Sequence, residues 1–154
     1  MKKGNIKIII LILLFIVIDF VSKILVINLL KSNTLIIISN FLKFTYIKNM
    51  GAAFGILSGN IILLIIITLF FIYYIIKELK NNSDKKLSII SYALILSGAI
   101  GNLIDRVFRG YVVDFISFTI FGREMAVFNV ADSYITIGVI LLLISMFKEN
   151  LWKK

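Results

Sequence analysis

Apolar residues gather in four long runs, which shorter and more polar stretches separate. The runs cover residues 6–30, 56–76, 87–104 and 130–147. A helix needs about 17–25 predominantly apolar residues to cross the hydrocarbon core of a bilayer, and each run lies in that range. The pattern therefore predicts four transmembrane helices, in a single membrane domain that covers residues 1–154.

The first run has an alternative interpretation as a cleaved signal peptide, because Lys2, Lys3 and Lys7 stand at its start. Such a peptide has an apolar region of about 7–15 residues and a small-residue cleavage site. This run is longer and contains no Ala-x-Ala-like site. We therefore expect it to be retained as a span.

The segments between the spans also carry structural signals. Residues 42–46 alternate between apolar and polar positions, and residues 112–118 are rich in β-branched and aromatic side chains. Both patterns are typical of short strands. Residues 51–55 are interpreted as a flexible turn. The predicted fold class is thus an all-α integral membrane protein with a small extracytoplasmic β-element, formed by segments 31–55 and 107–129.

Lysine and arginine are distributed in a way that favours cytoplasmic termini. With both termini inside, the polar loop 77–86 is cytoplasmic and ten basic residues lie inside: Lys2, Lys3, Lys7, Lys77, Lys80, Lys85, Lys86, Lys148, Lys153 and Lys154. Six then lie outside: Lys31, Lys43, Lys48, Arg106, Arg109 and Arg123. Cytoplasmic loops carry an excess of basic residues. Membrane topology therefore accounts for the net charge of +9, and no nucleic-acid partner is expected.

Composition limits the available chemistry. The chain is 60% hydrophobic, with a mean hydropathy of +1.05, and it contains no cysteine and no histidine. Disulfides, thiolate metal sites, Ser–His–Asp triads and Cys–His pairs are therefore excluded. Hydrolytic chemistry would depend on carboxylates, lysine, serine or threonine. We expect neither a metal nor a cofactor.

Ionisable residues of three spans lie at a common depth. A rise of about 1.5 Å per residue places Asp19 ~20 Å, Asp132 ~22 Å and Asp105 ~27 Å from the inner face of a core about 30 Å thick. Snorkelling explains the long side chains of Lys23 and Arg106, but it explains Asp19 and Asp132 poorly. The layer therefore indicates function, because each buried charge costs about 2.5–3.5 kcal/mol. Asp19 and Lys23 stand at i and i+4 and can form an ion pair, with a structural or substrate-positioning role.

The third span combines small and polar residues. Ser97 and Gly101 have the small-xxx-small spacing that lets another helix approach closely. Asn102, Asp105 and Arg106 follow and point roughly the same way at the outer end. They form either an interfacial anchor or the wall of a polar pocket.

Two further aspartates lie at the outer edge of the membrane. Asp114 stands between apolar neighbours in a strand-like run, where aspartate is unusual. Asp132 opens the fourth span, with Asn129 at i−3, and could serve only to cap that helix. In a chain without histidine or cysteine, these two carboxylates together are the candidate catalytic pair.

Five motifs follow one another over nearly the whole chain. They are Asp19-x-x-x-Lys23, Asn49-x-Gly51-Ala52-Ala53-Phe54-Gly55, Gly98-x-x-Gly101-Asn102-x-x-Asp105-Arg106, Val112-Val113-Asp114-Phe115 and Phe128-Asn129-Val130-Ala131-Asp132. In this order they resemble the motifs of the lipoprotein signal peptidase (signal peptidase II) family. Each motif alone is weak, whereas five in the right order on four spans form a strong signal. Phe20 and Ser22 depart from the common Gln and Thr, and Ser97 departs from a common Gly.

The resemblance implies an intramembrane aspartic endopeptidase in the cytoplasmic membrane of a bacterium. It would remove signal peptides from prolipoproteins that carry diacylglycerol, cutting just before the lipidated cysteine. Asp114 and Asp132 would be catalytic. The residues that would shape the pocket and hold the substrate are Asn49, Gly51, Asn102, Asp105, Arg106, Asn129 and Ala131. Membrane lipids would be its other partners, its active site would face outward, and a monomer would suffice.

A small transporter or channel subunit is the alternative function, because intramembrane Asp, Lys and Arg also mark ion pathways. Such a pathway needs polar groups through the whole membrane, whereas the inner two-thirds of these spans is apolar. A structural partner protein without chemistry would not explain Asp114 or Asp132. The protease is therefore the favoured interpretation.

Overall fold

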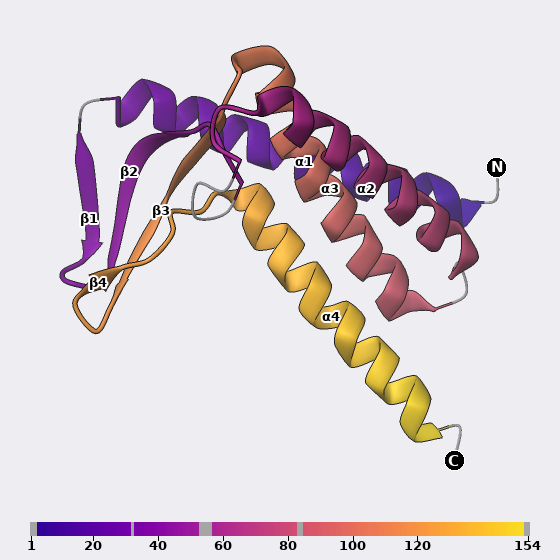
Figure 1. Cartoon of the computed structure of the whole chain (residues 1–154). Helices are drawn as coiled ribbons and strands as arrows, with labels where there is room; N and C mark the ends of the chain where they lie inside the picture. Colours follow the sequence, from indigo (N-terminus) through magenta and orange to yellow (C-terminus); the bar gives the residue numbers. More distant parts are fainter. Residues whose placement is uncertain (1–2, 32, 53–56, 83–84, 153–154) are drawn as a thin grey trace.

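The computed structural model describes residues 3–31, 33–52, 57–82 and 85–152 of the chain. The helices are α1 (Lys3–Leu29), α2 (Ile61–Asn81), α3 (Lys86–Arg109) and α4 (Val130–Trp152). The strands are β1 (Thr34–Ile38), β2 (Leu42–Asn49), β3 (Val112–Ile120) and β4 (Arg123–Glu124). The sheet lies at one end of the helices, and the N-terminal end of α1 and the C-terminal end of α4 lie away from it (Figure 1).

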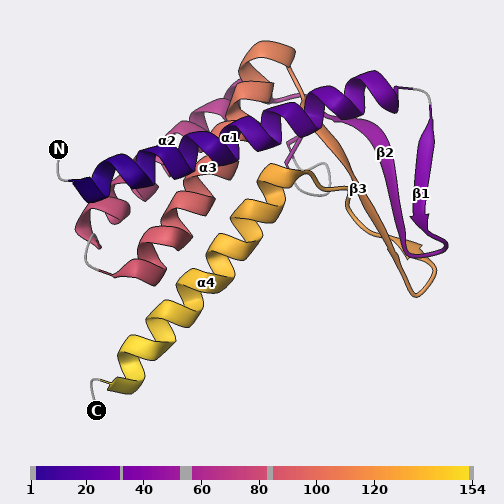
Figure 2. The same ribbon diagram turned by 180° about the vertical axis from the view of Figure 1, so that it is seen from behind.

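Helix α3 is the centre of the molecule and packs against α1, α2 and α4 (Figures 1 and 2). Two-thirds (67%) of its most apolar window is buried, against 11–17% in the other three helices. The outward faces of those helices carry large apolar side chains, such as Ile10, Ile62 and Phe147. All four helices are long and apolar enough to cross a membrane. The expected four-span membrane fold is therefore confirmed.

The strands form one antiparallel sheet in the order β1-β2-β3-β4. Strands β2 and β3 contain the two segments that the sequence predicts to be extended. Strand β1 was not predicted, because every residue from Thr34 to Ile38 is exposed and its sequence therefore lacks the alternation of a half-buried strand. In β2 and β3, Asn49 pairs with Val112 and Ile47 pairs with Asp114. This register brings the end of β2 beside the start of β3.

All four helices extend beyond their apolar runs: α1 begins at Lys3 instead of residue 6, and α4 continues past residue 147 to Trp152. Helix α2 covers Ile61–Asn81 instead of 56–76, so that residues 77–81 of the expected loop are helical. Helix α3 continues past 104 to Arg109 and ends at Gly110, whose φ of +76° suits a left-handed cap. Hydropathy measures which residues prefer lipid, whereas a helix continues until its backbone is capped. Residues 53–55 of the expected turn and residues 83–84 of the loop lie outside the described ranges.

Small residues on α3 let two other helices approach it closely. A Cβ atom on Gly101 would lie 2.5 Å from Oδ2 of Asp19 on α1, and 3.4 Å from Cβ of Ala131 on α4. Gly98 lies directly against the backbone of Ala131. Ser97, the other member of the predicted small-residue pair, donates from Oγ to the carbonyl of Ala93 at 2.7 Å. Helix α3 is thus where α1 and α4 meet.

A methyl group at Gly101 is expected to disturb this meeting point. Gly101→Ala would push the Asp19 carboxylate from its place, and overpacking of this kind typically costs about 1–3 kcal/mol. We expect a clearly lower melting temperature in detergent. Val107→Ile is the matched control, because it also enlarges a side chain on α3, at a position that is 54% exposed. Equal melting of the two variants would contradict the close packing.

Candidate active site

The start of α4 is held by a reciprocal pair of hydrogen bonds between Asn129 and Asp132. Oδ1 of Asn129 accepts the backbone N–H of Asp132 at 2.9 Å, and Oδ2 of Asp132 accepts the backbone N–H of Asn129 at 3.2 Å. This is the geometry of a capping box. Asp132 therefore does take part in capping, as the alternative interpretation expected. The capping box occupies Oδ2 and leaves Oδ1 for other contacts.

Strand β3 places Asp114 next to this helix start. Its carboxylate is almost fully buried, with 2% of the residue exposed. Oδ2 accepts from Nδ2 of Asn49 at 2.8 Å, and Oδ1 accepts from Nδ2 of Asn129 at 2.7 Å. Asn129 thus donates its side-chain amide to Asp114 and its backbone N–H to Asp132. One buried asparagine links the two carboxylates that the sequence analysis paired.

The third amide of the site belongs to Asn102 on α3. Its Nδ2 donates to Oδ1 of Asp132 at 2.8 Å. Its Oδ1 accepts from Nζ of Lys23 at 3.0 Å and from Nδ2 of Asn129 at 3.2 Å. These two donors fix the orientation of the amide, since reversing it would set Nδ2 against two other N–H donors. Asn102 therefore always presents an N–H to Asp132.

The Lys23 ammonium lies behind this network, with 1% of the residue exposed. It contacts Oδ2 of Asp19 at 2.8 Å, Oδ2 of Asp105 at 3.1 Å and Oδ1 of Asn102 at 3.0 Å. The ion pair expected from the i, i+4 spacing is present, and two acceptors from α3 join it. Nε of Arg109 lies 2.9 Å from the other oxygen of Asp105. The charged side chains of this ion cluster are two acids and two bases, so their net charge is zero, which lowers the cost of burying them. They are Asp19, Lys23, Asp105 and Arg109.

The two carboxylates of this ion cluster also hold backbone amides. Oδ1 of Asp19 accepts the N–H of Ala131 at 2.9 Å. Oδ2 of Asp105 accepts the N–H of Val113 at 3.1 Å. Ala131 and Val113 directly precede Asp132 and Asp114 in the chain. The ion cluster therefore positions the backbone beside each aspartate of the pair.

A cavity of about 680 Å³ opens in front of the two aspartates. Five of the residues predicted for the site line it: Asn49, Asn102, Arg106, Asp114 and Asp132. The other six are buried behind this wall: Asp19, Lys23, Gly51, Asp105, Asn129 and Ala131. The site thus has a polar wall facing the cavity and a buried layer that supports the wall.

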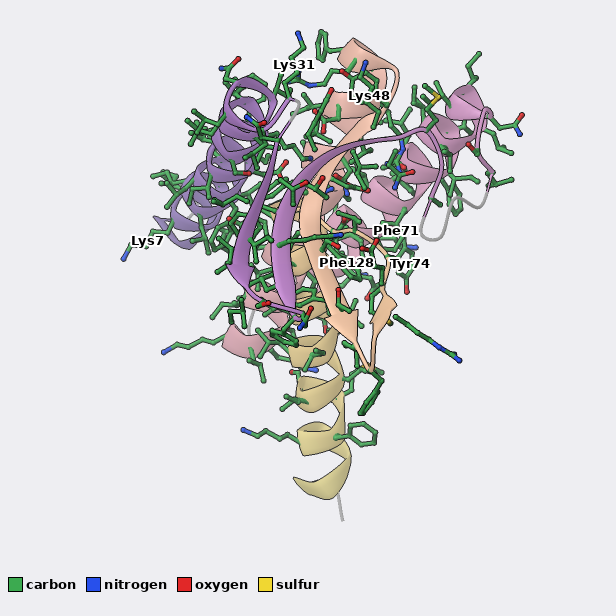
Figure 3. The ribbon with its side chains drawn as sticks, turned by 90° about the vertical axis from the view of Figure 1, so that its left-hand side faces the viewer. Lys7, Lys31, Lys48, Phe71, Tyr74 and Phe128 are labelled. Atoms are coloured by element: carbon green, nitrogen blue, oxygen red, sulfur yellow. The ribbon has the colours of Figure 1, made fainter. Side chains whose placement is uncertain are left out.

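Much of the cavity wall was not predicted. Helix α2 contributes Ile67, Thr68 and Phe71, and α4 contributes Ile135. Phe71 and Phe128, which both line the cavity, are labelled in Figure 3. These residues belong to apolar runs or to their edges, and hydropathy alone does not show which face of a span turns inward.

Gly51 contributes to the site through its backbone. Its carbonyl accepts from Nη2 of Arg106 at 3.3 Å, and its N–H donates to Oδ1 of Asn49 at 2.9 Å. The second bond orients the Asn49 amide so that Nδ2 reaches Asp114. Within the described ranges, no three His, Cys, Asp or Glu side chains are placed to hold a metal ion. The polar side chains that line the cavity are the carboxyls of Asp114 and Asp132, the amides of Asn49 and Asn102, the Arg106 guanidinium, the Lys48 ammonium and the hydroxyls of Ser58, Thr68 and Thr136.

Burial raises the pKa of Asp114 to about 6, from an ordinary value of 3.8. The negative charge of Asp132 raises this pKa further, whereas the amides of Asn49 and Asn129 and the charge of Lys23 oppose the shift. A carboxyl with a pKa near neutrality can hold or release a proton at physiological pH. Perturbed groups of this kind are concentrated at catalytic sites.

Comparison with known proteins gives consistent matches. The family model described as signal peptidase (SPase) II matches residues 11–148. A lipoprotein signal peptidase of Staphylococcus epidermidis is 46% identical over 147 residues, which cover 92% of this chain and 89% of the relative. One of Staphylococcus aureus (strain MRSA252) is 43% identical over 159 residues, covering 99% and 96%.

Solved structures of bacterial membrane enzymes share the fold. One, described at 2.3 Å resolution, has a TM-score of 0.88 and 36% identity, and the match covers 96% of this chain and 92% of that one. Another, at 1.9 Å, has a TM-score of 0.83 and 36% identity, with coverage of 92% and 93%.

The raised pKa of Asp114 predicts a pH-dependent difference in stability between the wild type and Asp114→Asn. Because the folded state binds the proton more tightly than the unfolded state, the stability from this group is complete below pH 3.8 and is lost as pH rises through about 6. Between pH 4.5 and 7.5 the wild type should lose about 2 kcal/mol relative to the variant. Unfolding of both proteins in detergent at the two pH values measures this change. A difference that stays constant with pH would contradict the shift.

Proposed function

The chain belongs to the signal peptidase II family, and from that premise we propose that it is an intramembrane aspartic endopeptidase. Its substrates are prolipoproteins that carry diacylglycerol on a cysteine, and it cleaves just before that cysteine. Asp114 and Asp132 are the catalytic pair. The observation that carries this proposal is the link that Asn129 makes between two carboxylates at one cavity.

The surroundings of the two carboxylates suit proton sharing. Two carboxyls in a buried site do not both ionise cheaply, so one proton serves the pair. The amides of Asn49, Asn102 and Asn129 all donate to the carboxylate oxygens. Such donors hold the orientation of both carboxyls without removing the shared proton, because an amide N–H neither gains nor loses a proton here.

The mechanism follows from this arrangement. The ionised carboxyl accepts a proton from a water molecule, which attacks the scissile carbonyl carbon. The protonated carboxyl donates a hydrogen bond to the developing oxyanion and later supplies the proton that the leaving amine needs. Either aspartate can hold the proton first, because such a pair titrates as a unit. At the pH where one carboxyl is ionised and the other protonated, the pair is competent.

The cavity also suits a lipid-modified substrate. Its apolar wall includes Ile67 and Phe71 of α2 and Ile135 of α4, and the outward faces of these helices are apolar. Acyl chains that stay in the bilayer would hold the cysteine near the headgroups, at the depth of the aspartates. With the termini in the cytoplasm, this site lies toward the extracytoplasmic face of a bacterial membrane. One copy of the chain supplies the whole site.

Replacing either aspartate by asparagine should abolish cleavage. Asp114→Asn and Asp132→Asn should each lower kcat by several orders of magnitude, because an amide neither acts as a base nor shares a proton. The double variant should be scarcely slower than either single variant, since the two residues act as a unit. Cleavage of a diacylated prolipoprotein by purified protein measures these rates.

A control is needed because asparagine has only one side-chain oxygen and so loses one of the hydrogen bonds that each carboxylate accepts. The control separates the effect of a lost hydrogen bond from the loss of the carboxyl itself. Ser133→Ala removes the bond from Oγ of Ser133 to the carbonyl of Asn129 at 3.0 Å, in the same turn of α4. It should lower the melting temperature slightly and leave cleavage near normal. Near-normal cleavage by Asp132→Asn would reduce Asp132 to a capping residue and overturn the aspartic mechanism.

Cleavage should depend on the lipid. We expect a diacylated prolipoprotein to be cut and the same chain without diacylglycerol to remain intact, because the acyl chains hold the peptide bond at the depth of the aspartates. Mass spectrometry of the products should give a mature chain that begins at the lipidated cysteine. Equal cleavage of both chains, or a product that begins elsewhere, would contradict the proposed specificity.

A further inference from the structure

We propose that Lys23 is a positioning residue of this protease, whose buried charge keeps one of the two catalytic carboxyls ionised and whose hydrogen bond orients the Asn102 amide. The inference rests on the proposed function, because it assigns Lys23 a role toward the pair Asp114 and Asp132. A purely structural ion pair with Asp19 would only lower the cost of burying the two charges, whereas the proposed role acts on the catalytic pair.

The contacts place the ammonium one amide away from Asp132 and two amides away from Asp114. Nζ of Lys23 donates to Oδ1 of Asn102, and Nδ2 of the same amide donates to Asp132. The same Oδ1 accepts from Asn129, whose Nδ2 is also 2.7 Å from Asp114. A positive charge in a site of low dielectric acts strongly over such short paths. It stabilises the ionised form of a nearby carboxyl.

Lys23 itself takes no part in proton transfer. An ammonium has three N–H groups, and Asp19, Asp105 and Asn102 accept all three. With 1% of the residue exposed, it reaches neither water nor substrate. Its influence on the reaction is therefore exerted through Asn102 and through its charge.

Other charges surround the pair and must be counted. Asp19 comes from α1. Asp105, Arg106 and Arg109 come from α3, and Lys48 of β2 lines the same cavity. The two aspartates of the pair, on β3 and α4, also act on each other. Asp19, Lys23, Asp105 and Arg109 balance one another. Removing one charged group changes the net charge of this balanced cluster by one unit. Loss of a positive charge should raise the pKa of the pair, and loss of a negative charge should lower it.

The test is the pH dependence of kcat/KM for three variants. The acid limb of this profile is the rise in kcat/KM at low pH, as one carboxyl of the pair ionises. Lys23→Met removes a positive charge and should move the acid limb upward by about 0.5–1 pH unit, whereas Asp19→Asn removes a negative charge and should move it downward by a similar amount. The double variant restores the balance, and its acid limb should return close to that of the wild type. A purely structural role would change stability and rate without moving the limb.

The rate at the pH optimum reports the second part of the proposal. Lys23→Met and the double variant should both be slower by roughly tenfold, the effect of about one lost hydrogen bond on Asn102. Lys31→Met is the matched control, because it removes an exposed positive charge at the outer end of α1. It should move neither the acid limb nor the rate.

The outcomes separate the two proposals. Acid limbs that stay in place in folded variants would overturn the role of Lys23, even if Asp114→Asn and Asp132→Asn are inactive. Active aspartate variants would instead overturn the proposed function. If Lys23→Met does not fold, the downward shift in Asp19→Asn and the return in the double variant still decide the matter.

Discussion

A lysine side chain buried inside a membrane protein is the constraint on which this structure depends. An isolated ammonium costs several kcal/mol to desolvate, and Lys23 is 1% exposed. Its burial is tolerable only because three oxygens surround it, from Asp19 on α1 and from Asn102 and Asp105 on α3. Helices α1 and α3 therefore have to meet at one depth and in one rotation. Gly101 permits that approach, since a larger residue would collide with Asp19.

The same contacts carry the constraint to the candidate active site. Asp19 accepts the backbone N–H of Ala131, which precedes Asp132. Asp105 accepts the backbone N–H of Val113, which precedes Asp114. The start of α4 and the start of β3 are thus both fastened to the ion cluster. Three asparagine amides then orient the carboxyls in front of it. Preorganised polar groups that hold the reacting carboxyls in one orientation are what catalysis by a carboxyl pair requires.

Much of the architecture could be predicted from the sequence, because lipid imposes a simple rule on helix composition. The common depth of the polar residues likewise predicted the gathering of Asp19, Asp105 and Asp132. The spacing of Asp19 and Lys23 predicted their pairing. The contacts of Lys23 with α3 could not be predicted, since they depend on how two helices rotate against each other. Hydropathy does not indicate how two apolar helices are rotated about their axes.

Other features escaped prediction for different physical reasons. Nothing in the properties of Asn49 indicates that its amide reaches Asp114, because that contact depends on the register of β2 and β3. Only the motif resemblance pointed to it. Strand β1 is exposed on both faces and has no alternating pattern. The cavity wall from α2 is mostly apolar, as is the outward face of that helix, so composition does not distinguish the two.

The central claim is that Asp114 and Asp132 act on one scissile carbonyl. It is tested most directly by an experimental structure with a lipopeptide analogue, in which a hydroxyl-bearing carbon replaces the scissile carbonyl. The account predicts that the hydroxyl lies about 2.6–3.2 Å from an oxygen of each aspartate, with the acyl chains beside α2 and α4. A hydroxyl that contacts only one aspartate, or lies away from both, would contradict the account.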